Sequence, residues 1–246
     1  MLIAGFPAGP WGTNCYLVAK GRGMPCVIVD PGKDAVAGGA AGAFNSVEQL
    51  VRAHDLRPAG VLLTHGHIDH IWCATPVAQR YDVPVWIHPA DRHLLTDPLA
   101  GISSQWAGLL GGQEFVEPAD LRELGDHDVL ELAGLTVTVD HMPGHTAGSV
   151  TLRLPYDQGI PDDDPGGGAT ELMFSGDVLF AGSIGRTDLP GGDHATMLTT
   201  LATRVLPLDD RIVVLPGHGA QTTIGRERGT NPFLADLPAT SSTRGR

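Results

Sequence analysis

Short apolar stretches that stop at glycine, proline or acidic residues recur along the chain and predict strands. In the N-terminal part these strands are expected over 1–6, 14–18, 26–29, 61–63 and 83–87. Apolar positions at helical spacing predict two helices, one that begins at Asn45 or Ser46 and one over 71–81. The predicted order of this half is therefore βββαβαβ.

The second half also consists of strands followed by helix. Further strands are predicted over 129–132, 135–139, 150–154, 171–174 and 212–215. The first two are joined by Ala133-Gly134, a plausible hairpin turn. Asp193 is the expected N-cap of a helix, and a short helix is expected over 222–228. Both halves are thus expected to be rich in strands, with helices packed on them.

We expect one domain over 1–230, followed by a loose polar tail over 231–246. The segment 155–170 is rich in Pro, Gly and Asp and is interpreted as a disordered hairpin tip. The stretch 97–113 holds apolar residues among glycines and serines. It is either an ordinary surface insertion or a lid over a site, and the sequence leaves both open.

Potential metal ligands are concentrated directly after the predicted strand 61–63. They are His65, His67, Asp69 and His70. Imidazole and carboxylate are ligands that zinc, iron and manganese accept. Alternation along extended chain would point His65 and His67 the same way, whereas a helix starting near Asp69 would turn His70 elsewhere. One short segment can therefore serve two adjacent metal positions.

Further ligand-type residues follow later predicted strands. His145 comes after strand 135–139, Asp177 after strand 171–174 and His218 after strand 212–215. Each lies beside glycine, which lets backbone approach an ion or substrate without a Cβ in the way. Open α/β sheets place their sites where strands end. We therefore expect these residues to meet the first cluster.

With these residues in this order, the chain resembles the metallo-β-lactamase fold superfamily, whose signature is H-x-H-x-D-H followed by His, Asp and His. The resemblance implies an α/β (α+β) fold, a four-layer αββα sandwich. It also implies two divalent metal ions, with zinc expected and iron or manganese compatible. One ion would be held by His65, His67 and His145 and the other by Asp69, His70 and His218, with Asp177 bridging. Asp69 is also the expected catalytic carboxylate.

Within the superfamily, the stretches 182–192 and 216–219 look like the short glyoxalase II-like thioesterases. This likeness makes Arg186 a candidate substrate-binding residue, although an arginine paired with Asp188 is an equal alternative. Asp30, before Pro31-Gly32, is either a turn residue or the acceptor for a ligating histidine. Larger glyoxalase II proteins carry a C-terminal helical domain that this sequence lacks, so a small thiol other than glutathione is equally compatible.

The amino-acid composition limits the kinds of partner and the cellular location that we expect for this protein. The formal charge is −12, from 16 Lys+Arg against 28 Asp+Glu, so nucleic acid is not expected as a partner. No apolar stretch is long enough to span a membrane, and no signal peptide is evident, so a cytoplasmic protein is expected. Cys15, Cys26 and Cys73 are expected to be buried thiols. The oligomeric state is left open.

The expected reaction is hydrolysis of a small-thiol thioester, resembling S-2-hydroxyacylglutathione, by a metal-bound hydroxide. A metal ion lowers the pKa of bound water from 15.7 to about 7. A thiolate leaving group with a pKa of about 8.5 needs little help from an acid. Two alternatives stay open: a persulfide dioxygenase with one iron on His65, His145 and Asp177, and a binding module without catalysis.

Overall fold

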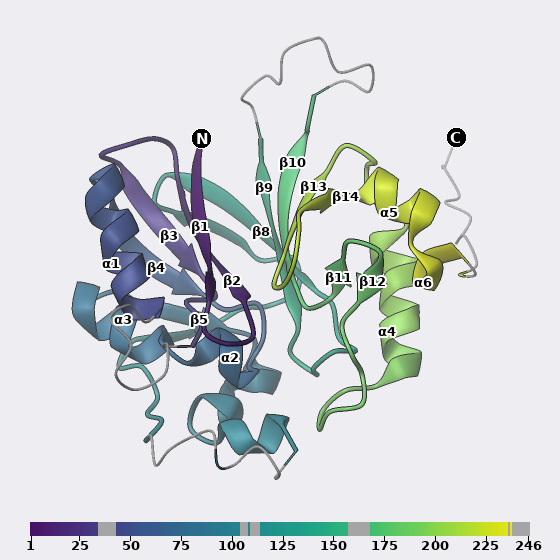
Figure 1. Ribbon diagram of the computed structural model, residues 1–246, viewed down its shortest axis with the longest axis horizontal. Helices are drawn as coiled ribbons and strands as arrows, with labels where there is room; N and C mark the ends of the chain where they lie inside the picture. Colours follow the sequence, from purple (N-terminus) through teal and green to yellow (C-terminus); the bar gives the residue numbers. More distant parts are fainter. Residues whose placement is uncertain (34–42, 104–107, 109–113, 157–167, 236, 238–246) are drawn as a thin grey trace.

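A computed structural model of the chain describes residues 1–33, 43–103, 108, 114–156, 168–235 and 237 (Figure 1). Its N-terminal half contains β1 (Leu2–Ala8), β2 (Thr13–Ala19), β3 (Pro25–Val29), α1 (Ala43–His54), β4 (Arg57–Leu62), α2 (Ile68–Ile71), α3 (Ala74–Tyr81), β5 (Val85–Ile87), η1 (Pro89–Leu95), η2 (Pro98–Gly101) and β6 (Leu121–Glu123). The predicted order βββαβαβ matches the structure up to β5, except that two helices, α2 and α3, stand where one was expected between β4 and β5.

The C-terminal half continues with a second group of strands and then helices. These elements are β7 (Val129–Leu132), β8 (Leu135–His141), β9 (Val150–Pro155), β10 (Glu171–Gly176), β11 (Leu179–Phe180), β12 (Ser183–Ile184), α4 (His194–Thr200), the π-helical turn η4 (Leu201–Val205), β13 (Val213–Pro216), β14 (Thr222–Thr223), α5 (Ile224–Thr230) and α6 (Pro232–Ala235).

The strands form two mixed sheets. In the first, the order is β1-β2-β3-β4-β5-β6, antiparallel up to β3 and parallel from β3 onward. In the second, the order is β14-β13-β10-β9-β8-β7, with β10 and β13 as its parallel pair. Strands β11 and β12 form a separate small hairpin beside the second sheet.

Several central strands are buried on both faces, which explains why they read as continuous apolar runs. In β2, Cys15 and Leu17 pack into the cluster under the N-terminal helices, whereas the alternating Val18 joins the cluster between the sheets. In β10, Leu172 and Phe174 face the same intersheet cluster, and Met173 faces the C-terminal helices. Because side chains alternate along a strand, each of these strands contributes to two cores, and the two strands together contribute to three.

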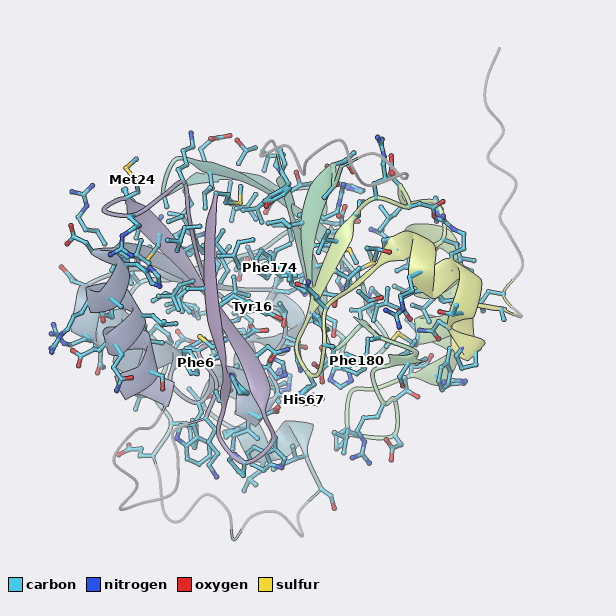
Figure 2. The ribbon with its side chains drawn as sticks, turned by 45° about the horizontal axis from the view of Figure 1, so that its top comes forward. Phe6, Tyr16, Met24, His67, Phe174 and Phe180 are labelled. Atoms are coloured by element: carbon cyan, nitrogen blue, oxygen red, sulfur yellow. The ribbon has the colours of Figure 1, made fainter. Side chains whose placement is uncertain are left out.

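These three cores define four layers, helix, sheet, sheet and helix, as the resemblance to the superfamily implied (Figure 1). Between the sheets, Tyr16 of β2 and Phe174 of β10 pack edge to face with 5.2 Å between ring centroids (Figure 2). All three cysteines are buried beneath the N-terminal helices, as expected. Among the described residues, no helix combines the length and apolar character needed to cross a membrane.

Two predicted helices have different bounds. The single helix expected over 71–81 is two helices, α2 and α3, because the Cys73 backbone N–H donates to Gly32 O at 2.9 Å and the chain turns there. The helix expected over 222–228 starts only at Ile224. Thr222 and Thr223 pair with β13 instead, and the Thr223 hydroxyl accepts from the Arg226 N–H at the helix start.

The expected loose tail differs from the structure at its beginning. Asn231 is fully buried, and its side-chain amide donates to Ser183 O at 3.0 Å and to Glu227 Oε2 at 2.9 Å. Helix α6 follows, with Leu234 in the core under the C-terminal helices. Residues 236 and 238–246 lie outside the described part of the chain. So do 157–167 of the expected hairpin tip and 104–107 and 109–113 of the candidate lid.

Candidate metal centre

The predicted metal donors lie in segments that follow strands at one edge of the two sheets. Residues 64–70 follow β4, His145 follows β8, Asp177 follows β10 and His218 follows β13. Because β10 and β13 are parallel neighbours, their carboxyl ends lie together, and an isolated bridge between Thr13 and His218 links this edge to the first sheet. The placement is the one expected for a site in an open α/β fold.

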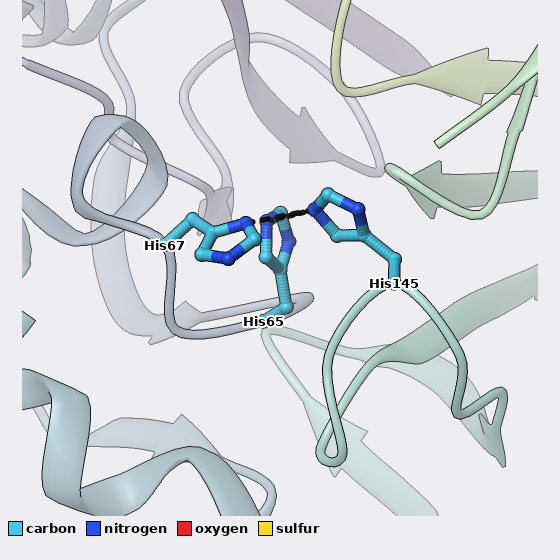
Figure 3. A group of neighbouring side chains, drawn as sticks. All are labelled: His65, His67 and His145. Atoms are coloured by element: carbon cyan, nitrogen blue, oxygen red, sulfur yellow. Dashed lines mark hydrogen bonds between the residues drawn. The ribbon is translucent and has the colours of Figure 1, made fainter. Parts of the chain in front are cut away.

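His65, His67 and His145 form the first donor group (Figure 3). The Nε2 atom of His145 lies 2.8 Å from His67 Nδ1 and 3.2 Å from His65 Nε2. All three side chains are buried, with exposed fractions of 4% or less. Three imidazole nitrogens that face one common point are an arrangement that suits a metal ion.

Asp69, His70 and His218 form a second donor group beside the first. Asp69 Oδ2 lies 3.4 Å from His70 Nε2 and 3.2 Å from His218 Nε2. As the sequence analysis anticipated, Asp69 and His70 belong to a helix, α2, while His65 and His67 precede it. The change from extended chain to helix is what sends neighbouring residues to different groups.

Asp177 lies between the two groups. Its Oδ2 is 3.6 Å from His145 Nε2 in the first group and 3.6 Å from His218 Nε2 in the second. Its Oδ1 is 3.4 Å from His70 Nε2. The structure therefore brings together all seven residues that the sequence selected.

Most of these histidines use their other ring nitrogen for a hydrogen bond within the protein. His70 Nδ1 donates to Asp30 Oδ2 at 2.9 Å, and His145 Nδ1 donates to Arg186 O at 2.7 Å. His218 Nδ1 lies 3.2 Å from Trp11 O. A hydrogen bond at Nδ1 fixes the ring orientation and leaves Nε2 with a lone pair directed into the cluster.

Hydrogen bonds from Thr64 hold Asp30 in position to accept from His70 Nδ1. Asp30 follows β3 with a left-handed backbone (φ 46°), and its carboxylate accepts from both the N–H and the hydroxyl of Thr64, at 2.8 and 2.6 Å. The geometry therefore supports the second interpretation of Asp30, in which its carboxylate accepts a hydrogen bond from a candidate metal ligand, His70. The Thr64 hydroxyl also lies 3.1 Å from His65 Nδ1, so one carboxylate and one hydroxyl support histidines of both groups.

Several buried polar atoms of the cluster have no hydrogen-bond partner. They are His67 Nε2, His70 Nε2 and Asp177 Oδ1. Buried polar atoms are normally satisfied, and leaving one unpaired costs about 1–3 kcal/mol. Divalent metal ions would compensate this cost at His70 and Asp177, whose orphaned atoms face the donor cluster. The donor chemistry and these atoms together fit a metal centre.

Comparison with known proteins agrees with this geometry. A family model described as the metallo-beta-lactamase superfamily matches residues 8–160. The chain belongs to this superfamily. An uncharacterized protein of Mycobacterium tuberculosis is 46% identical over 96% of this chain and 99% of its own length. The hydroxyacylglutathione hydrolase GloC of Haemophilus influenzae is 34% identical, covering 95% of this chain and 98% of the relative.

Solved structures of the superfamily superpose over nearly the whole chain. The BLEG-1 B3 metallo-beta-lactamase has a TM-score of 0.76 at 36% identity, with 95% of this chain and 99% of that one covered. The protein TTHA1623, solved in a di-iron-bound form, has a TM-score of 0.70 at 33% identity, with coverages of 95% and 100%. The expected fold and the resemblance to glyoxalase II-like members are thus both supported by relatives above 30% identity.

In this metallo-beta-lactamase superfamily member, burial keeps His65 and His67 of the first group neutral. Burial and the neighbouring imidazoles lower the pKa of His65 well below its ordinary value. Burial and the adjacent His145 lower the pKa of His67 to about 3. Both rings are therefore in the neutral form that ligates metal ions at physiological pH.

The second group is governed by its carboxylates. Burial opposes the charge on His70, but Asp69, Asp177 and Asp30 outweigh it and raise the His70 pKa well above its ordinary value. Burial likewise disfavours ionised Asp69 and Asp177, but His70 holds the pKa of both below the usual range. Ionised Asp69 and Asp177 therefore favour positive charge at this position, carried either by the imidazoles or by a cation that they bind.

A pocket of about 450 Å³ opens over the centre. His67, Asp69, His145, Asp177 and His218 line it on the side of the centre. Arg186 also lines it, but the guanidinium is 59% exposed and forms a bidentate pair with Asp188, with both N–O distances 2.7 Å. Arg186 contacts the centre through its backbone carbonyl, which accepts a hydrogen bond from His145 Nδ1.

Two further residues support the centre without any signal of this role in the sequence. Asp91, at the start of η1, is 1% exposed and accepts hydrogen bonds from the loops that carry His65 and His145. The Thr13 hydroxyl donates to Asp69 Oδ2 at 2.8 Å. An Asp in a first helical turn and a Thr in a strand are ordinary residues at such places, so nothing in the sequence distinguished them.

Proposed function

We propose that this protein hydrolyses small-molecule thioesters of the S-2-hydroxyacylglutathione type, with two divalent metal ions in the centre. The observation that carries the proposal is the convergence of two complete donor groups on either side of Asp177, beneath an open pocket. His65, His67 and His145 would hold one ion, and Asp69, His70 and His218 the other, with Asp177 shared. Zinc is the expected metal, and iron or manganese would suit the same donors.

Divalent ions, when bound here, supply a nucleophilic hydroxide at neutral pH and polarise the acyl carbonyl. In the overall reaction, water oxygen bonds to the acyl carbon, the carbon–sulfur bond breaks, and the products are a carboxylic acid and a thiol. A thiolate with a pKa of about 8.5 is a good leaving group near neutral pH. This explains how the reaction can proceed without a dedicated acid beside the sulfur.

The chain's own residues prepare the site for this reaction. Asp30, Arg186 O and Trp11 O orient the imidazoles before substrate arrives, which reduces reorganisation during the reaction. Asp69 is the proposed catalytic carboxylate. Its low pKa keeps it ionised, and Thr13 fixes its Oδ2, so it is able to accept a hydrogen bond from an attacking water.

The similarity to GloC supports thioester hydrolysis over other reactions of the superfamily. The complete second donor group also favours this reaction over a single-iron persulfide dioxygenase, which would need only His65, His145 and Asp177. A cytoplasmic location stays a prediction from the sequence.

The proposal is tested by metal content and by hydrolysis of two S-lactoyl thioesters, those of glutathione and of N-acetylcysteamine. We expect about two metal ions per chain, loss of hydrolysis on chelation and its recovery when metal is restored. Asp177→Asn should lose metal and activity, whereas Asp97→Asn, at an exposed position outside the centre, should keep both. One iron per chain with oxygen uptake on a persulfide, or hydrolysis confined to β-lactams, would overturn the proposal.

A further inference from the structure

The walls of the pocket above the metal centre are apolar. Away from the candidate ligands, the side chains that line it include Trp11, Ile68, Ile102, Phe180, Ile184 and Leu189. They come from the β1–β2 turn, α2, the residue after η2, and the segment around β11 and β12. A substrate group that binds here would exchange contact with water for contact with hydrocarbon, which favours apolar groups.

The pocket offers little to a carboxylate. Arg186 is the only Lys or Arg among the described residues that line it, and both oxygens of Asp188 already engage its guanidinium. A substrate carboxylate could bind Arg186 only by displacing Asp188 or by lying next to it. In the first case Asp188 would lose its partner, and in the second the two carboxylates would share one guanidinium and repel each other, so neither is favourable.

Lys33 is also engaged elsewhere. It is 8% exposed, and its ammonium group contacts two aromatic rings, 4.8 Å from the Trp11 centroid and 4.3 Å from the Trp72 centroid. These cation–π contacts hold the ammonium group at the rings. Lys33 is not among the residues that line the pocket, so it adds no cation to the lining.

The sequence extends this inventory to residues that the structure does not describe. The segments 34–42, 104–107, 109–113 and 157–167 contain no Lys or Arg. Beyond the described part of the chain, the cationic side chains are Arg244 and Arg246. The candidate lid therefore has no cation to contribute, whatever its position.

We propose that the thioesters this site accepts carry an apolar, uncharged group around the sulfur, in preference to an anionic peptide such as glutathione. This proposal rests on the proposed function and narrows its substrate class. The metal centre would bind the reacting acyl group, and the apolar walls would favour an uncharged group around the thioester sulfur. Apart from the metal ions, which the reacting acyl group would occupy, the described lining offers no free cationic side chain to a thiol with two carboxylates.

Binding tests this preference without requiring any hydrolysis. The probes are S-hexylglutathione and its dimethyl ester, which share one scaffold and differ in the two carboxylates. With metal-loaded protein in a calorimeter, we expect the diester to bind roughly tenfold more tightly, because only the diacid would place carboxylates beside Asp188 and against the apolar walls. Equal or tighter binding of the diacid would overturn the proposal.

Substitutions then test which residues cause the preference for the diester. Asp188→Asn should release Arg186 and tighten binding of the diacid several-fold while leaving the diester nearly unchanged. The double substitution Arg244→Gln with Arg246→Gln should change neither affinity. If the double substitution abolished a preference for the diacid, the tail would be the anion site and the proposal would be wrong.

Kinetics separate this proposal from the proposed function. Metal-loaded protein should hydrolyse the S-lactoyl thioester of N-acetylcysteamine with a higher kcat/KM than S-lactoylglutathione. If neither is hydrolysed while the diester still binds more tightly, the proposed reaction fails and the apolar preference stands. If both are hydrolysed and the glutathione thioester is preferred, the reaction stands and the apolar preference fails.

Discussion

Asp91 and Gly148 approach so closely that a Cβ at position 148 would lie 2.6 Å from the Asp91 Cγ. The Gly148 N–H donates to Asp91 Oδ1 at 2.8 Å. The other oxygen of Asp91 accepts from the Gly66 N–H at 2.8 Å and from the Thr146 hydroxyl at 2.7 Å. One buried carboxylate thus joins the loop of His65 and His67 to the loop of His145, and so sets the distance between the ligands of the first group.

Asp91→Asn should loosen the first metal position. An asparagine side chain has one oxygen and therefore cannot accept all three hydrogen bonds, which leaves a buried donor unpaired at a cost of about 1–3 kcal/mol. We expect lower stability in urea unfolding and metal affinity reduced by roughly 10–100-fold, the usual effect of losing support behind metal ligands. Metal titration with a competing chelator measures the affinity.

The matched control for Asp91→Asn is Asp97→Asn, which changes an exposed carboxylate at the start of η2 that forms no capping hydrogen bond. Stability and metal affinity should be unchanged in this variant. If Asp91→Asn lowered stability but left the metal affinity at the parental value, Asp91 would support the fold without positioning the ligands.

Gly217→Ala should disturb the centre through direct contact. A Cβ at position 217 would lie 2.3 Å from Asp177 Oδ1 and 2.7 Å from His70 Cε1, closer than real contacts allow. We expect loss of most bound metal and a hydrolytic rate lowered by about 100-fold or more, since misplacement by about 1 Å costs that much. Elemental analysis and initial rates provide the measurement.

Gly229→Ala is the control for Gly217→Ala. Gly229 lies in α5, and a Cβ there would meet no atom within 4 Å. Alanine in a helix is more favourable than glycine by roughly 0.5–1 kcal/mol, so this variant should be slightly more stable and fully active. Full metal content in Gly217→Ala would mean that the loop shifts without moving Asp177 or His70.

The donors were predictable because each lies directly after an apolar strand. Leu62 and Leu215, for example, belong to strands buried on both faces, so the next polar residues must emerge at the sheet edge. The assignment of His65 and His70 to different groups also follows from local sequence, since extended chain gives way to helix between them. These features depend on neighbours in the chain.

What could not be predicted depends on distant partners. The break between α2 and α3 is made by Gly32 O, about 40 residues earlier in the chain. The importance of Asp91 depends on backbone N–H groups of remote loops. Strand β6 was missed because Leu121–Glu123 is short and largely exposed, and pairing with β5 alone defines it. The choice between the two roles of Arg186 required the position of Asp188.

Asp126 should contribute to stability in a pH-dependent way. Its carboxylate accepts from Arg204 at 2.8 and 2.7 Å and from the His141 N–H at 2.8 Å, and the Arg204 hydrogen bonds lower its pKa to about 2. Because this pKa lies below that of the unfolded chain, about 3.9, the folded state binds fewer protons between these values. The contribution is therefore present above about pH 4 and is lost as the pH falls toward 2.

Asp126→Asn tests this contribution. The pair is about one-third exposed, so we expect only about 1 kcal/mol of destabilisation at neutral pH. Urea unfolding of chelated parent and variant should give curves that differ most at about pH 6, less at about pH 3, and converge as the pH falls toward about 2. Asp209→Asn, in a local surface pair with Arg211, should have little effect at either pH. A difference between parent and Asp126→Asn that stays constant with pH would show that packing, and not ionisation, is responsible.

His70→Ala and His218→Ala should each empty one of two metal positions. Both residues belong to the second donor group, and the first group, His65, His67 and His145, is untouched by either substitution. We expect metal content to fall to about half, with hydrolysis lowered by at least about 100-fold because both ions take part in the proposed reaction. His93→Ala, at an exposed position in η1, should keep full metal content and activity.

The two substitutions should also differ from each other in stability. His70 is fully buried and hydrogen-bonded to Asp30, so removing it leaves a cavity and a buried carboxylate that has lost one partner. His218 is 27% exposed, and its loss opens the site toward solvent. In chelated protein, His70→Ala should therefore lower the unfolding free energy by about 1–3 kcal/mol more than His218→Ala. Unaltered metal occupancy in both variants would show that Asp69, His70 and His218 do not form a separate metal position.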